Sequence, residues 1–155
     1  MFVDVVNVTS AADMADVVKS KAAEQDIIIM TAAVADFCPS HPADEKIKKN
    51  DSSYESVIEL ERTEDILSYL GAHKAKGQLI CGFSMETQNM LENSKAKLAK
   101  KNADMIVANN LKVAGAGFGT DTNVVTLITA DDFTELEIMD KIFVAARIMD
   151  RLLKM

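Results

Sequence analysis

The sequence predicts an α/β protein of three layers, with a mostly parallel sheet, a β flap, and a C-terminal hairpin followed by a helix. Short apolar runs occur at residues 27–30, 79–83 and 105–107, and such runs are typical of parallel strands that are buried on both faces. Between these runs lie segments whose apolar residues recur at helical spacing. Strands that alternate with helices indicate a layered α/β architecture.

The first half of the chain contains two predicted helices among three predicted strands. Residues 3–8 are rich in valine and predict a strand. Ser10, with Asp13 three residues later, forms a capping-box pattern that begins a helix ending near residue 24. The further elements of this half are a strand at 26–30, a loop at 38–43 that holds both prolines, a strand at 54–60, and a helix that Thr63 caps and that ends near residue 73.

The second half continues the alternation and ends in a hairpin and a helix. Its elements are a strand at 79–83, a helix at 88–102, a strand at 104–108, a loop at 113–123 with three glycines, hairpin strands at 124–128 and 133–138, and a helix from about residue 140. We expect the apolar face of this last helix to consist of Ile142, Phe143, Ala146, Ile148, Met149, Leu152 and Leu153. The order predicts a Rossmann-like fold in a single domain, residues 1–155.

Composition and charge exclude several classes of protein. The formal net charge is −7, which argues against nonspecific nucleic-acid binding, because that binding needs a basic face. No apolar run approaches the roughly 18 residues that span a bilayer. The N-terminus carries no basic region before its apolar stretch, so it does not resemble a secretory signal, and we expect a cytoplasmic protein. Cys38 and Cys81 lack metal-ligand spacing and are predicted to be free thiols.

Small and polar residues follow the predicted parallel strands, at the edge where ligands bind in open sheets. Asp36 follows the first apolar run, and its carboxylate can accept hydrogen bonds from a sugar hydroxyl or a base amine. Phe83 follows the second and can stack on a nucleobase. Asn109 follows the third. The alternative for each is structural: Asp36 caps a turn, and Phe83 packs in the core.

Two groups of lysines stand out against the acidic background. Lys46 and Lys48 alternate on an extended segment, and Lys97 and Lys101 lie four residues apart on one helix face. Such clusters can bind phosphate and neutralise developing charge, although the alternative is an ordinary solvated surface. No GxGxxG pattern is present, which disfavours a dinucleotide-dependent dehydrogenase.

These features form an ordered set of motifs: AAVADF, EKIKK, TEDIL, GFSMET, KLAKKNADMIVANN and GFGTDTN. The order and spacing resemble bacterial phosphopantothenate–cysteine ligase, a family that is often fused behind a flavin-dependent decarboxylase. The resemblance extends from Val3 to Leu153. It implies a ligase of coenzyme A biosynthesis that joins 4′-phosphopantothenate to cysteine, with CTP as co-substrate, Mg²⁺ as cofactor and an acyl-cytidylate as intermediate.

The resemblance also implies roles for individual residues. Lys46 would be catalytic, on a flap, and would stabilise the activated intermediate or its breakdown. Lys97 and Lys101 would hold the triphosphate or the cytosine side. The other residues implied in nucleotide binding are Ala32, Ala33, Asp36, Glu64, Asp65, Ile66, Leu67 and Phe83.

One departure from the family affects the expected activity. Family members begin with a further strand, a glycine-rich turn and an asparagine that contacts the acyl phosphate, and this sequence has no counterpart before Met1. We therefore expect an N-terminally truncated ligase domain, weak or inactive by itself, that forms a homodimer and has a decarboxylase as a further candidate partner. The alternatives are a non-catalytic nucleotide-binding module, one half of a split enzyme, or a flavin- or nicotinamide-dependent oxidoreductase.

Overall fold

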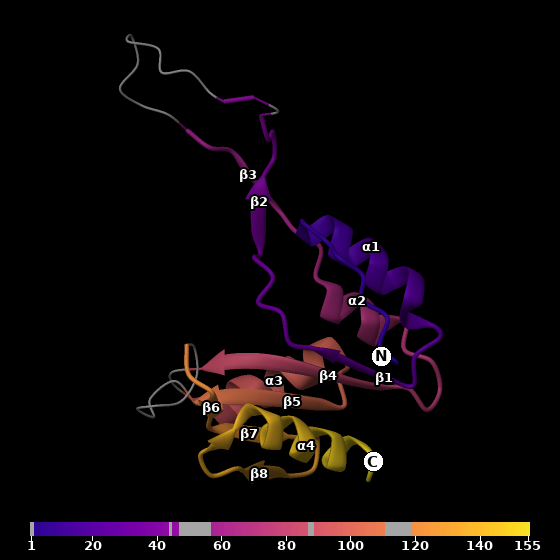
Figure 1. The fold of residues 1–155 in the computed structure, drawn as a ribbon, viewed down its shortest axis with the longest axis vertical. Coiled ribbons are helices and arrows are strands. Elements are labelled where there is room, and N and C mark those ends of the chain that lie inside the picture. The colour runs from indigo at the N-terminus through magenta and orange to yellow at the C-terminus, as the bar shows by residue number, and fades with distance from the viewer. Residues whose placement is uncertain (1, 44, 47–56, 87–88, 111–118) are drawn as a thin grey trace.

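A five-stranded mixed sheet forms the centre of the molecule, with helices on both faces (Figure 1). The computed structural model describes residues 2–43, 45–46, 57–86, 89–110 and 119–155. The helices are α1 (Ala11–Ala22), α2 (Ile66–Ala72), α3 (Met90–Lys101) and α4 (Lys141–Leu152). The strands are β1 (Ile27–Met30), β2 (Phe37–Pro39), β3 (Leu60–Arg62), β4 (Leu79–Glu86), β5 (Met105–Asn110), β6 (Thr122–Asn123), β7 (Val125–Ile128), β8 (Phe133–Glu135) and β9 (Met139–Asp140).

The order of strands in the sheet is β1-β4-β5-β7-β8. β1, β4 and β5 are parallel neighbours, whereas β7 pairs antiparallel with β5 and β8 pairs antiparallel with β7. The carboxyl ends of the three parallel strands therefore meet at one edge. This arrangement confirms the predicted Rossmann-like layout and the C-terminal hairpin followed by a helix.

The sheet divides the core into two clusters. Ile106 of β5 points toward α1, α2 and α3, where it packs with residues such as Ile80 and Leu70. Its neighbours Met105 and Val107 point to the opposite face, which α4 covers. All three β5 side chains are fully buried. An uninterrupted apolar run is thus required here, because both faces of the strand are covered.

Helix α1 begins as the sequence predicts. The Ser10 hydroxyl oxygen accepts the backbone N–H of Asp13 at 3.0 Å, and the Asp13 carboxylate accepts the backbone N–H of Ser10 at 3.0 Å. Both bonds of the capping box are present. They satisfy N–H groups that have no partner within the helix.

The prediction of a strand at residues 3–8 is wrong. These residues form no strand, and Val3 and Val5 are 64% and 73% exposed. A strand exists only when its backbone groups pair with a neighbour, and none of the strands in the described part of the chain pairs with this segment. A high valine content favours a strand, but it does not show whether a neighbouring strand is available for pairing.

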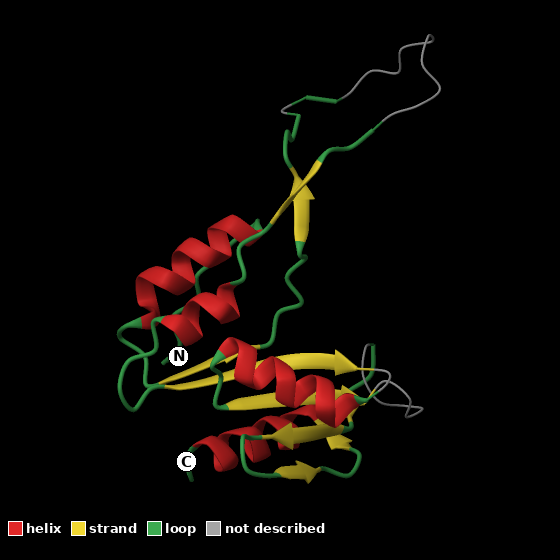
Figure 2. Cartoon of the chain, turned by 180° about the vertical axis from the view of Figure 1, so that it is seen from behind, coloured by secondary structure: helices red, strands yellow, loops and turns green. Residues whose placement is uncertain are grey.

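The predicted flap is an arm built from β2 and β3, which stands away from the body (Figures 1 and 2). Phe37 of β2 lies opposite Arg62 of β3 in an antiparallel pair. The predicted loop at 38–43 is therefore wrong at its start, because Pro39 ends β2. The predicted strand at 54–60 is displaced: residues 57–59 are not in a strand, and residues 54–56 lie outside the described part.

Two helix predictions differ in detail. The helix predicted to begin at Thr63 begins at Ile66, and Asp65 caps it by accepting the backbone N–H of Ser68 at 3.0 Å. In α4 the buried stripe is Val144, Ile148 and Leu152. Ile142, Phe143 and Leu153, which the sequence pattern assigns to the apolar face, are 74%, 60% and 71% exposed.

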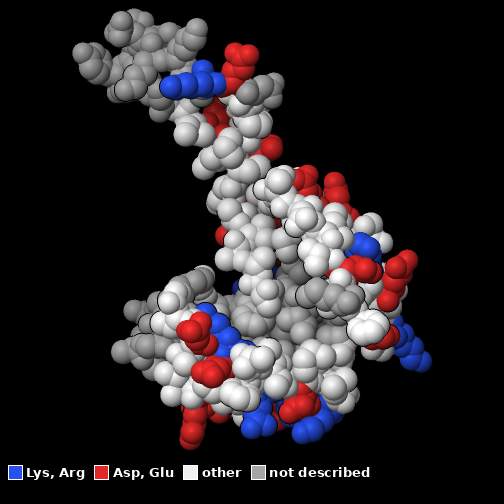
Figure 3. Space-filling model, in the orientation of Figure 1, with Lys and Arg blue, Asp and Glu red and all other residues white. Residues whose placement is uncertain are grey.

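Charge is mixed over the face drawn in Figure 3, where acidic and basic side chains alternate over the body. No helix in the described residues is long and apolar enough to cross a membrane.

Candidate nucleotide-binding site

A cavity of about 180 Å³ lies where the carboxyl ends of β1 and β4 meet α2 and α3. It brings together every residue predicted to bind nucleotide except Ala33. The lining residues are Met30, Ala32, Val34, Ala35, Asp36, Thr63, Glu64, Asp65, Ile66, Leu67, Phe83, Lys97 and Lys101. Lys46, the predicted catalytic residue, is exposed and lies on the arm instead.

The base of the arm forms one wall of this cavity. The Thr63 hydroxyl donates to the carbonyl oxygen of Ala35 at 2.5 Å, and the Thr63 backbone N–H donates to the carbonyl oxygen of Asp36 at 3.0 Å. These bonds tie the chain that enters the arm to the chain that leaves it. The sequence indicates Thr63 only as a helix cap, so its place in the wall was missed. The available signal is that Thr63 is the first residue of the TEDIL motif, whose other four residues also line the cavity.

Lys101 and Asp65 face each other across the cavity wall. The Lys101 ammonium forms an ion pair with the Asp65 carboxylate and also donates to the Ser68 hydroxyl at 3.0 Å. Partial burial works to raise the pKa of Asp65, but the hydrogen bonds from Lys101 and from the Ser68 backbone outweigh it and hold that pKa below its ordinary value. Asp65 is therefore a carboxylate at neutral pH.

Lys97 presents a cation that forms no ion pair with a carboxylate in the described part of the chain. Its ammonium donates to the carbonyl oxygen of Phe83 at 2.9 Å, a bond that ties α3 to the end of β4. In the described residues, no Asp or Glu oxygen lies within 4.0 Å of this ammonium. An ammonium retains two further donors after one hydrogen bond, so Lys97 can bind an anion in the cavity.

A second cavity, of about 670 Å³, lies on the opposite face of the sheet beside α4. Asn109, which the sequence placed at the ligand-binding edge, lines this cavity and not the first. Its side-chain oxygen accepts a hydrogen bond from the Asn123 amide at 2.8 Å. The wall is mainly apolar and includes Ile29, Phe83 and Met149. Phe83 therefore contributes to both cavities.

Comparison with known proteins identifies the family. The whole chain, residues 1–155, matches the family described as DNA/pantothenate metabolism flavoprotein C-terminal domain. The chain belongs to this family. The predicted resemblance is thus confirmed at the level of the family, the DNA/pantothenate metabolism flavoprotein C-terminal domain.

Relatives of this C-terminal domain family occur in longer proteins. The chain is 48% identical over 146 residues to the coenzyme A biosynthesis bifunctional protein CoaBC of Bacillus subtilis (strain 168), a match that covers 94% of this chain and 35% of that protein. It is 45% identical over 152 residues to a protein named cysteine/cysteine sulfinic acid decarboxylase from an unknown prokaryotic organism, covering 97% of this chain and 42% of that protein. The chain thus spans less than half the length of these relatives.

Solved structures agree with the fold. The C-terminal domain of a coenzyme A biosynthesis bifunctional protein CoaBC superposes with a TM-score of 0.76 at 41% identity, covering 96% of this chain and 66% of that chain. The DNA/pantothenate metabolism flavoprotein of Streptococcus pneumoniae also gives a TM-score of 0.76, at 16% identity, and covers 95% and 71% of the two chains. The second likeness bears on the fold alone.

Proposed function

We propose that this chain forms the nucleotide-binding part of a ligase of coenzyme A biosynthesis that joins 4′-phosphopantothenate to cysteine at the expense of CTP. The observation that carries the proposal is the cavity at the carboxyl edge of the sheet, where small residues, an aromatic ring and two lysines converge. The similarity to CoaBC proteins supports the pathway. We propose CTP, and not ATP, as the nucleotide co-substrate.

The proposed reaction has two steps. A carboxylate oxygen of 4′-phosphopantothenate attacks the α-phosphorus of CTP, the bond to the β-phosphate oxygen breaks, and pyrophosphate leaves. The cysteine amine then attacks the acyl carbon, loses a proton, and displaces CMP. Both steps concentrate negative charge on phosphate oxygens, so fixed cations and good positioning supply most of the catalysis.

The cavity contains groups suited to this task. Lys97, which pairs with no carboxylate among the described residues, is the proposed contact for the triphosphate, and Lys101 is the second. Ala32 and Ala35 allow close approach of a ligand to the backbone, and Phe83 supplies an aromatic surface for the base. We assign to Lys46, on the arm, the role of neutralising charge on the acyl-cytidylate.

Mg²⁺ fits this site only as a companion of the nucleotide. The described residues contain no cluster of three or more His, Cys, Asp or Glu side chains that could hold a metal ion. Mg²⁺ commonly binds through one or two carboxylates together with substrate phosphates. Asp36 lines the cavity and has no ion-pair partner in the described structure, so it is the carboxylate that would hold such an ion. Mg²⁺ would neutralise phosphate charge.

Two further parts of the proposal concern assembly. We propose that the ligase acts as a homodimer, which light scattering at micromolar concentration tests; a monomeric mass would refute it. A flavin-dependent decarboxylase is the proposed partner, and a relative whose name includes a decarboxylase activity supports it.

Calorimetric titration of the 155-residue chain with CTP and Mg²⁺ tests the nucleotide site, with ATP as the comparison ligand. We expect saturable CTP binding that Lys97→Gln weakens about tenfold, because a hydrogen bond to a charged group contributes about 1.5–3 kcal/mol. Lys100→Gln is the matched control, since Lys100 lies on the same helix, is exposed and does not line the cavity. Equal weakening by both substitutions would contradict the assignment of the cavity.

A further inference from the structure

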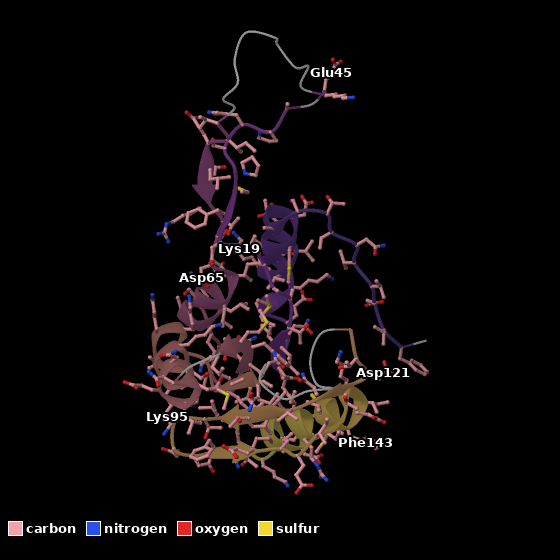
Figure 4. All side chains as sticks on the ribbon, turned by 90° about the vertical axis from the view of Figure 1, so that its left-hand side faces the viewer. Lys19, Glu45, Asp65, Lys95, Asp121 and Phe143 are labelled. Carbon is pink, nitrogen blue, oxygen red and sulfur yellow. The ribbon has the colours of Figure 1, made fainter. Side chains whose placement is uncertain are left out.

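The connection between the arm and α2 is tied to the opposite leg of the arm and to two helices of the body. Thr63 bonds the opposite leg of the arm, at Ala35 and Asp36. The next residue, Glu64, pairs with Lys19 of α1, and Asp65 pairs with Lys101 of α3. Figure 4 shows Lys19 and Asp65 near the base of the arm and Glu45 near its far end. The direction of the arm is therefore fixed by this short connection.

Lys19 contributes to this connection from outside the cavity. Its ammonium lies 2.6 Å from the Glu64 carboxylate and 5.2 Å from the centre of the Tyr69 ring on α2. The hydrogen bond to Glu64 outweighs partial desolvation and raises the pKa of Lys19 above its ordinary value. The side chain is only 26% exposed, so the lysine is held between the two helices. A cation–π contact and an ion pair together fix its position.

We propose that Lys19 is a positioning residue for the nucleotide site. By pairing with Glu64, Lys19 anchors the base of the arm to α1. The inference rests on the proposed function of the cavity, and it extends the site to a helix that supplies no residue of the cavity wall. Nothing in the AAVADF, TEDIL or GFSMET motifs indicates a role for this lysine, because it precedes Glu64 by 45 residues.

The ion pair between Lys101 and Asp65 also holds the connection, but it cannot replace the pair that Lys19 forms. Lys101 is bonded to Asp65 and is also a proposed triphosphate contact, so phosphate and Asp65 compete for the same ammonium. Glu64 takes its cation from outside the cavity, where a bound anion does not compete directly. The Lys19–Glu64 pair therefore keeps the arm attached when nucleotide is bound. It also neutralises a carboxylate that would otherwise repel phosphate.

Hydrogen–deuterium exchange of the full 155-residue chain tests this anchor. The Thr63 backbone N–H is the reporter, because its bond to the Asp36 carbonyl joins the two legs of the arm. Lys19→Met keeps an apolar stem against Tyr69 and removes the charge. We expect the Thr63 amide to exchange about threefold faster in this variant, because a partly exposed ion pair contributes only a small stabilisation. The exchange rates of the β5 amides should not change.

Two variants make the result specific. Lys21→Met is the control, since Lys21 lies on the same helix, is exposed, and forms no ion pair in the described structure. Lys19→Arg should restore slow exchange. The inference is overturned if Lys19→Met behaves like Lys21→Met, or if it accelerates exchange at β5 as much as at Thr63, which would indicate general destabilisation.

A CTP titration of the unsubstituted chain separates this inference from the proposed function. Failure of CTP to bind counts against the nucleotide site, but the exchange rate of Thr63 still decides whether Lys19 anchors the arm. Normal CTP binding with an unchanged Thr63 exchange rate in Lys19→Met refutes the anchor and leaves the proposed function standing.

Discussion

Gly71, next to the last residue of α2, should not tolerate even a methyl group. A Cβ atom at this position would lie 1.8 Å from the backbone carbonyl oxygen of Lys101 and 3.2 Å from the Cβ of Asn102. Contacts of a Cβ below 3.0 Å are essentially never observed, so the two helices would have to separate by more than 1 Å. The nearest atom belongs to the backbone and cannot rotate away.

The sign of the effect distinguishes packing from helix propensity. Alanine is favoured over glycine in a helix by about 1 kcal/mol, so propensity alone predicts that Gly71→Ala stabilises the protein. Overpacking costs about 1–3 kcal/mol. Separation would also stretch the hydrogen bond from the Asn102 amide to the Gly71 carbonyl oxygen, now 2.7 Å, which contributes about 1 kcal/mol. The gain in propensity and the weakened hydrogen bond cancel, and the clash is with backbone, so the overpacking cost lies at its upper end. We therefore expect a net loss of about 2–3 kcal/mol.

Urea denaturation followed by circular dichroism measures this loss. With a slope of about 2 kcal/mol per molar urea, the unfolding midpoint should fall by about 1–1.5 M. Gly77→Ala is the control. Gly77 has a φ of +85°, and apart from its chain neighbours no described residue has an atom within 4 Å of the place that its Cβ would occupy. Only backbone strain of about 1–2 kcal/mol is therefore expected. A Gly71→Ala protein as stable as the original would refute the packing argument.

Three further outcomes are expected. Burial raises the pKa of the Cys81 thiol to about 12, so at pH 8 an aromatic disulfide reagent should label Cys38 alone in the native protein and both thiols in urea. The pKa of Asp65 is lowered in the folded state, so its contribution to stability is present above about pH 4 and is lost as the pH falls. Asp65→Asn should therefore flatten the dependence of the unfolding free energy on pH between about pH 5 and pH 2. A Cβ at Gly82 would lie 2.6 Å from a methyl group of Leu67, which can move into the cavity, so Gly82→Ala should weaken CTP binding while costing only about 1 kcal/mol of stability.

Local patterns in the sequence are sufficient for elements whose stability is itself local. The capping box of Ser10 and Asp13 uses atoms three residues apart, and the sequence predicts it in detail. The apolar runs of β1, β4 and β5 are likewise predictable, because burial on both faces leaves a continuous signal. The prediction for the valine-rich segment at 3–8 fails because pairing depends on a partner strand that the segment does not specify.

The site shows the same division between local and distant information. The sequence pattern predicts Thr63 as the cap of α2, but Asp65 is an equally good residue for a helix cap. The Thr63 hydroxyl bonds the carbonyl oxygen of Ala35, 28 residues earlier, which leaves Asp65 as the cap. The motifs locate the cavity residues, whereas the Lys19–Glu64 pair depends on how α1 packs against α2.

The arm should be visible in the shape of the protein in solution. A compact chain of 155 residues has a radius of gyration of about 15 Å, but β2 and β3 carry mass well away from the body (Figure 2). Small-angle X-ray scattering of a monomer should therefore give a larger radius and a distance distribution with an extended tail.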